Sequence, residues 1–223
     1  MSDETTKTAA RDADDFVAGL VADLEPVKPV RLVTAIVWAI ALETLVALLA
    51  GWAMGLPAKG FTRLADPVFL GFILVLAAGA GASAAATAAL AIPGRVVGGV
   101  WRAAVIFLPL LLAVVVVVFS PWGGTWKGFL AVLVEGARCI EHTLEVAIPA
   151  WIAGLLLLRR LGPLDSLRVG LFAATSALLT SAIVVQLACP SCDSWHLALT
   201  HYLPVLLAAW AAGLLSSFVL RRP

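Results

Sequence analysis

Long runs of apolar residues divide the chain into six segments, each about as long as a membrane-crossing helix. A hydrocarbon core about 30 Å thick needs roughly 20 apolar residues per helical crossing. The predicted spans cover residues 32–55, 67–92, 103–120, a fourth segment ending at 158, 169–187 and 197–220. The runs exceed barrel-strand length and lack strand alternation, so the sequence predicts an all-α polytopic membrane protein with six transmembrane helices.

The fourth segment is the least apolar of the six. Its uncharged part, residues 146–158, is too short to cross a bilayer. A full crossing therefore includes Cys139, Glu141, His142 and Glu145 at its upstream end. Pro109 in the third span and Pro149 in the fourth are expected to bend their helices.

Composition and charge agree with a protein embedded in lipid. Hydrophobic residues make up 62% of the chain and charged residues 13%, and a soluble domain tolerates far less apolar surface. Eleven of the 15 Lys and Arg residues lie in 1–31, 93–102, 159–168 and 221–222. Since basic residues accumulate on the cytoplasmic side, both termini are expected in the cytoplasm. A net charge of +1 argues against nucleic acid as a direct partner.

Residues 1–31 are expected to form a cytoplasmic segment, separate from the transmembrane domain at 32–223. Within 12–25 the spacing predicts a short amphipathic helix whose apolar face is made of Phe16, Val17, Leu20, Val21 and Leu24. Seven of the 14 acidic residues fall within residues 1–27. The anionic inner leaflet would repel such a helix, so its apolar face more plausibly docks a protein. The alternative is a helix that caps the bundle from below.

All three cysteines and all three histidines are predicted at the non-cytoplasmic face. They are Cys139, His142, Cys189, Cys192, His196 and His201. Thiolates and imidazoles are the donors preferred by soft or borderline ions such as zinc, cadmium and copper(I), and thiols also react with oxidants. We therefore treat the three cysteines as candidate sensing thiols and all six residues as candidate ligands. A transient soft metal ion is the one cofactor that this pattern indicates.

The sequence alone leaves several uses of these cysteines open. One is a structural disulfide, joining Cys189 to Cys192 or Cys139 to either, because an oxidising compartment favours bridges between close cysteines. Another is a responsive redox or metal site. A membrane thiol-disulfide oxidoreductase using Cys189 and Cys192 is an enzymatic alternative. A small transporter is a further one, although internal repeats and more intramembrane charges would be expected of it.

One acidic residue, Glu43, lies midway along the first span. An ionised side chain there costs roughly 2 to 3 kcal/mol on insertion scales, so the carboxyl should be neutral or paired. A proton-path or ligand role is one interpretation. The other is a protonated carboxyl hydrogen-bonded to Ser or Thr on a neighbouring span.

Three stretches together resemble one protein family: "LVADLEPVKPVR" (20–31), "ARCIEHT" (137–143) and "CPSCDSWHLALTH" (189–201). With six spans, they resemble the NrsF family of bacterial inner-membrane anti-sigma factors. The resemblance implies that the chain is a regulator and not an enzyme. It also implies that the cytoplasmic segment holds an extracytoplasmic-function sigma factor. Cysteines matching Cys139 and Cys189 would then sense metal or oxidant stress and release that sigma factor.

Overall fold

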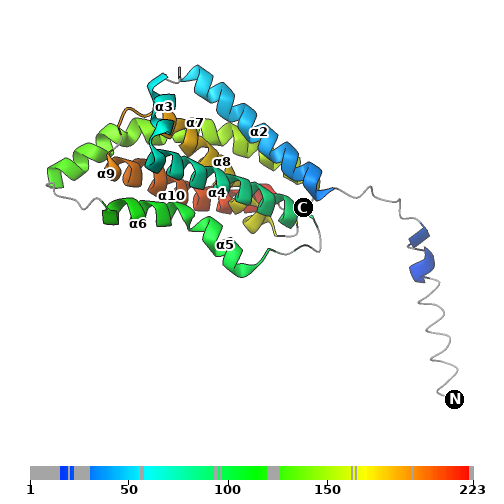
Figure 1. The fold of residues 1–223 in the computed structure, drawn as a ribbon. Helices are drawn as coiled ribbons and strands as arrows, with labels where there is room; N and C mark the ends of the chain where they lie inside the picture. Colours follow the sequence, from blue (N-terminus) through cyan, green and yellow to red (C-terminus); the bar gives the residue numbers. More distant parts are fainter. Residues whose placement is uncertain are drawn as a thin grey trace, which may run out of the picture. The chain divides into compact units, whose positions relative to one another are not determined.

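The apolar runs fold into long helices in the computed structural model of the chain (Figure 1). The structure describes residues 16–19, 21–22, 31–55, 58–92, 95, 97–119, 126–161, 163, 165–191 and 193–220. Every element of regular structure within these ranges is helical, which confirms the predicted all-α class. The chain divides into two compact units, Met1–Arg31 and Leu32–Pro223.

Five helices in the described part of the second unit are long and apolar enough to cross a membrane, and a bent pair of helices raises the number to six. The longer elements are α2 (Leu32–Ala53), α4 (Pro67–Ala91), α5 (Gly99–Ile106), α6 (Leu108–Phe119), α7 (Trp126–Leu161), α8 (Ser166–Ala188) and α10 (Leu203–Val219). The shorter ones are α3 (Ala58–Thr62), the 3-10 helix η1 (Arg63–Ala65), α9 (Ser194–His196) and the π-helix η2 (Leu197–Tyr202).

The segment predicted as one span at 103–120 is a bent pair of helices, α5 and α6, with an angle of 53° between them. The break falls at Phe107, two residues before Pro109. Proline has no N–H to donate and its ring clashes with the carbonyl four residues earlier, so it interrupts a continuing helix. As the second residue of α6, Pro109 falls in the first turn, where a helix leaves its N–H groups unbonded in any case.

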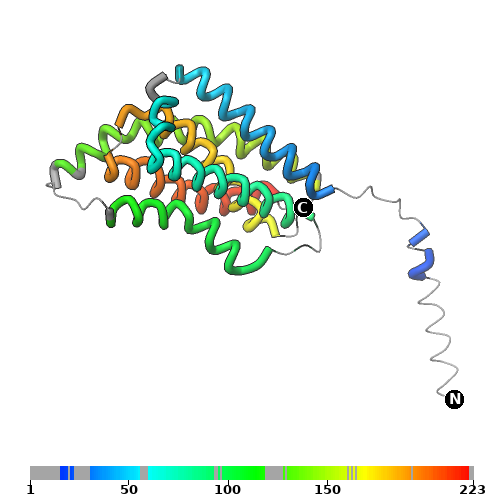
Figure 2. The backbone as a smooth tube through the Cα atoms, in the orientation of Figure 1, coloured from blue at the N-terminus to red at the C-terminus, as the bar shows by residue number. Residues whose placement is uncertain are grey.

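Helix α8 lies in the middle of the bundle, surrounded by α2, α4, α7 and α10 (Figure 2). Small residues allow its neighbours to approach closely. A Cβ added at Gly170 of α8 would lie 2.0 Å from the Cβ of Ser216 on α10. On α4, Gly79 faces Leu108 and Leu179, and Ser83 and Thr87 are also buried. Gly79, Ser83 and Thr87 recur every four residues along α4, and small residues at this spacing favour close helix packing.

The Glu43 carboxyl of α2 contacts two hydroxyls on α8. Ser176 Oγ lies 2.7 Å from Glu43 Oε2 and 2.9 Å from the carbonyl oxygen of Ala80, while Thr180 Oγ1 lies 3.3 Å from Glu43 Oε2. A serine hydroxyl carries one hydrogen. Both Ser176 contacts are therefore hydrogen bonds when a protonated Glu43 donates to Ser176, which in turn donates to Ala80. This is the hydrogen-bonded arrangement that the sequence offered as the second interpretation of Glu43.

We expect Gly170→Ala to destabilise the bundle by about 1–3 kcal/mol, the usual cost of overpacking. The added methyl group meets the Cβ of Ser216, which cannot move without the backbone of α10. The measurement is the unfolding midpoint in detergent. Gly154→Ala in α7 is the matched control, because a Cβ there meets nothing within 4 Å. Equal midpoints for the two variants would contradict close packing of α8 on α10.

Candidate metal centre

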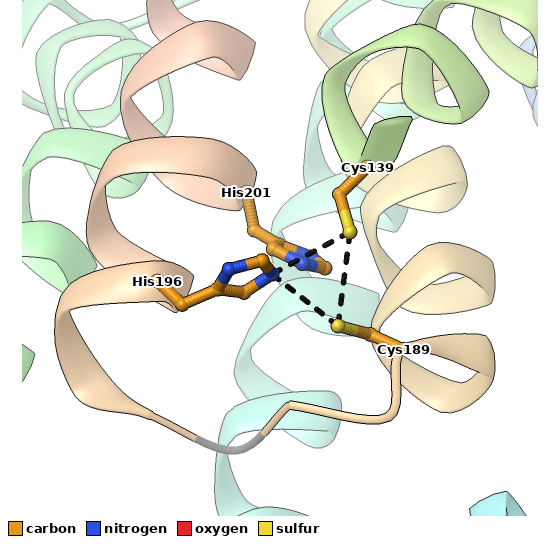
Figure 3. Close-up of side chains that lie close together, drawn as sticks. All are labelled: Cys139, Cys189, His196 and His201. Atoms are coloured by element: carbon orange, nitrogen blue, oxygen red, sulfur yellow. Dashed lines mark hydrogen bonds between the residues drawn. The ribbon is translucent and has the colours of Figure 1, made fainter. Parts of the chain in front are cut away.

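Four of the six candidate ligands converge at one end of the bundle (Figure 3). They are Cys139 of α7, Cys189 directly after α8, His196 at the end of α9 and His201 in η2. One donor atom from each lies within 4.8 Å of the others, and the side chains point toward one another. Cys189, His196 and His201 are buried, and Cys139 is partly buried.

The distances among three of the donor atoms match those of a tetrahedral metal site. The two sulfurs are 3.7 Å apart, and His196 Nε2 lies 3.4 Å from Cys139 Sγ and 3.3 Å from Cys189 Sγ. Tetrahedral zinc with bonds of about 2.3 Å to sulfur and about 2.0 Å to nitrogen places sulfurs about 3.8 Å apart and sulfur and nitrogen about 3.5 Å apart. The donor set therefore fits a Cys2His2 site for a soft or borderline ion.

The two histidines reach the same place because the helix widens between them. In an α-helix of 3.6 residues per turn, side chains five residues apart point about 140° away from each other. The π-helix η2 forms i to i+5 bonds, including one from Leu203 N–H to the Ala198 carbonyl. Such a turn brings residues 196 and 201 toward one face, and their ring centroids are 5.4 Å apart. Pro204 explains the wider turn, since it has no N–H to donate to Thr200 and its ring crowds that carbonyl.

A glycine brings Cys139 within reach of the histidines. A Cβ at Gly136 of α7 would lie 2.1 Å from Thr200 Cγ2, so only glycine permits this approach of α7 to η2. One helical turn further along α7 is Cys139. Thr200 Oγ1 also donates to the His196 carbonyl at 2.7 Å, which fixes its own side chain at the contact. The geometry of the site thus depends on the absence of a side chain at residue 136.

The loop between α8 and α9 positions Cys189 and His196. Cys189 is the C-cap of α8, and its N–H donates to the Val185 carbonyl. Asp193 caps α9 by accepting a hydrogen bond from the His196 N–H at 2.9 Å. Carboxylate capping of this kind is worth about 1 kcal/mol and sets the direction in which the short helix leaves the loop.

One member of the cluster, His201, is buried without a hydrogen-bond partner for its ring in the described part of the chain. Neither ring nitrogen of His201 has a hydrogen-bond partner among the described residues, although the side chain is fully buried. A buried polar group without a partner costs about 1–3 kcal/mol. A metal ion bound at one of these nitrogens would remove part of that cost.

The environment of Cys189 favours its thiolate, the form that binds metals and reacts with oxidants. The hydrogen bond from the Cys139 thiol lowers the pKa of Cys189 below its ordinary value. Burial acts in the opposite direction and raises the pKa. Cys139 and Cys189 are both free thiols.

The remaining candidate residues lie elsewhere or outside the described part of the chain. His142 is partly exposed on α7 and its Nδ1 lies 2.8 Å from Glu145 Oε2, so it does not join the four-residue group. Cys192 falls outside the described residues. In the first unit, Phe16, Val17 and Val21 are exposed, and Leu20 and Leu24 also fall outside the described residues.

Sequence reasoning missed Arg63, which contacts the loop that carries Cys189. Its guanidinium donates to the carbonyl oxygens of Cys189 and Pro190. Arg63 and Cys189 are 126 positions apart, and no spacing rule connects residues at that separation. The one feature of the sequence that could have drawn attention to Arg63 is its position on the predicted non-cytoplasmic side, where few basic residues are expected.

The architecture and the site together define a helical protein with apolar spans and a compact thiol and imidazole cluster at one end. A family model described as "NrsF: Negative regulator of sigma F" matches residues 20–221, nearly the whole chain. The chain therefore belongs to the NrsF family of negative regulators of a sigma factor, which confirms the resemblance seen in the sequence. No curated protein and no solved structure matches it.

We expect His201→Gln to weaken the binding of cadmium to the purified protein by at least about tenfold, the lower range for losing even an outer-shell partner of a metal site. Cadmium bound to thiolates absorbs in the ultraviolet, so a titration measures the affinity. His142→Gln is the matched control and should bind cadmium like the unchanged chain, because His142 lies outside the group. A loss of affinity in the control alone would contradict the four-residue site.

Proposed function

We propose that the protein is a membrane-embedded anti-sigma factor that releases its sigma factor when thiols on the outer side meet a soft metal ion or an oxidant. The observation that carries this proposal is the convergence of Cys139, Cys189, His196 and His201 in a chain of a sigma-regulator family. The proposed topology has six spans in the bacterial inner membrane and both termini in the cytoplasm. The distribution of Lys and Arg supports it, as do five or six helices of sufficient length.

The chemistry of the site suits two kinds of signal. A metal ion binds to both sulfurs and displaces their protons, since thiolate is the ligand form. An oxidant accepts two electrons while the thiols of Cys139 and Cys189 lose two protons and join as a disulfide. The sulfurs start 3.7 Å apart and would move to about 2.05 Å, the length of an S–S bond. Disulfide formation would draw α7 and the end of α8 together, whereas a metal ion would hold the two sulfurs near their present separation.

The partner that we propose is an extracytoplasmic-function sigma factor, held on the cytoplasmic side by residues 1–31. Phe16, Val17 and Val21 expose more than half of their surface, and large apolar side chains on an acidic helix are suited to a protein partner. Leu20 and Leu24 complete this apolar face in the proposed helix. Membership in a family of regulators favours this role over the oxidoreductase and transporter alternatives.

We expect Val21→Asp to abolish co-purification of the sigma factor with the full-length protein. A charge on the apolar face would be buried without a partner at the interface, and a tenfold loss of affinity requires only about 1.4 kcal/mol. Ala22→Asp is the matched control, because residue 22 falls on the opposite face of the predicted helix and should retain the partner. Equal recovery of the sigma factor with both variants would contradict docking through this face.

We expect a Cys139→Ser, Cys189→Ser double variant to repress a sigma-dependent reporter in unstressed cells and to keep it repressed under cadmium. The unchanged chain should release the sigma factor and raise reporter output. Serine retains the size of the side chain but not its affinity for soft ions. A normal response of the double variant would contradict the proposed trigger.

The side of the membrane is checked in the same cells. A maleimide that cannot cross the membrane should label cysteines of the unchanged chain in intact spheroplasts, and labelling should fall in the double variant. Labelling that requires broken cells would place the thiols in the cytoplasm and would contradict the proposed topology.

A further inference from the structure

We propose that Arg63 is a positioning residue that links the metal centre mechanically to α2, the helix that follows the sigma-binding segment in the chain. This inference rests on the proposed function of the cluster and adds a route by which its occupancy reaches residues 1–31. Three observations support it: the contacts of Arg63, the docking of the α2–α4 connection on α8, and the weak packing of α2.

The Arg63 guanidinium holds the loop that carries Cys189 by its backbone. Nη1 donates to the Cys189 carbonyl at 2.5 Å and Nη2 donates to the Pro190 carbonyl at 2.9 Å. Hydrogen bonds from a charged donor are stronger than neutral ones, and two parallel bonds also fix direction. A displacement of the Cys189 backbone is therefore transmitted to Arg63 and to η1.

The connection that carries Arg63 also sits directly on the end of α8. A Cβ added at Gly60 of α3 would lie 2.2 Å from the Leu187 carbonyl oxygen, so the two backbones are in contact there. Leu187 is two residues before Cys189. The connection between α2 and α4 thus rests on the same turn of chain that presents the ligand.

Of the five helices that are long and apolar enough to cross a membrane, α2 is the least buried. All of its residues are described, and Gly51 is the one that is fully buried. Its polar attachment to the bundle is the contact of Glu43 with Ser176 and Thr180 of α8. Arg63 fixes the connection that follows α2 in the chain to the loop that carries Cys189, and Glu43 fixes the middle of α2 to α8. A shift at the Arg63 end would therefore tilt α2 about Glu43.

Ligand binding has an effect at α2 only if the ligand favours one arrangement of the loop over another. Drawing the Cys189 sulfur onto a metal ion, together with Cys139 and the two histidines, restrains the backbone at 189–190. The carbonyl oxygens bonded to Arg63 belong to those two residues. The two hydrogen bonds of Arg63 connect these carbonyls to η1, so restraint of the loop also restrains η1. A side chain that cannot donate both hydrogen bonds would lose this connection.

Hydrogen exchange of the full-length protein in detergent, with and without cadmium as the probe, tests this link. In the unchanged chain, cadmium should slow exchange around Cys139 and at 189–203, and also at 58–66 and in the second half of α2. In Arg63→Gln, cadmium should bind with similar affinity and protect the first set of segments, while protection of the second set is lost. Arg63→Lys, which keeps the charge but loses the paired donors, should show partial protection.

The matched control is Arg138→Gln, which removes an exposed cation next to Cys139 and should leave all four regions protected. Protection of 58–66 that persists in Arg63→Gln would overturn the link and leave the proposed function standing. A loss of cadmium affinity in Arg63→Gln as large as that expected for His201→Gln would also overturn it, because Arg63 would then act on the ligand site itself. Absence of cadmium binding to the unchanged chain would contradict the metal-sensing function, which is a separate failure.

Discussion

Close approach between helix backbones is the constraint on which the rest of this structure depends. In a bundle whose helices differ little in polarity from lipid, contact at small residues supplies much of the cohesion. The same rule builds the site. Gly136 allows α7 to reach Thr200, Gly60 allows the α2–α4 connection to rest on Leu187, and Gly170 allows α10 to reach α8. Because glycine has no side chain at these contacts, segments that are distant in the sequence approach closely enough to bring their donor atoms together.

The sequence predicted the helical class and the convergence of cysteines and histidines at one end, because both follow from hydrophobic run length and from the order of the spans. It did not predict which residues of the cluster meet. Cys139 and His142 are three apart in α7, yet only Cys139 faces the site, since the rotation of α7 is set by its packing. His196 and His201 are five apart and would diverge in an ordinary helix, and the π-turn that unites them depends on Pro204 and tertiary contacts. Arg63 meets Cys189 through tertiary packing alone.

The function proposed above needs a strong local event and a weakly held element that responds to it. Metal ligation by thiolates supplies ample free energy, since structural zinc sites reach about 10–16 kcal/mol. Moving a two-state equilibrium from 1:99 to 99:1 requires about 5.5 kcal/mol. Helix α8 is too deeply buried to move alone, whereas α2 exposes most of its surface. The division of roles between a rigid centre and a loosely packed first helix follows from this difference in burial.

The unpartnered imidazole of His201 has a consequence for the resting protein. Burial without a hydrogen-bond partner among the described residues makes His201 a point of local frustration, which close packing around the fully buried Tyr202 and Thr200 tolerates. Hydrogen bonds to both nitrogens of His201 would stabilise the cluster as it stands and would have to be broken before an ion could bind there. Under the function proposed above, an ion that bound at a His201 nitrogen would relieve this cost, so the burial of His201 would favour metal binding.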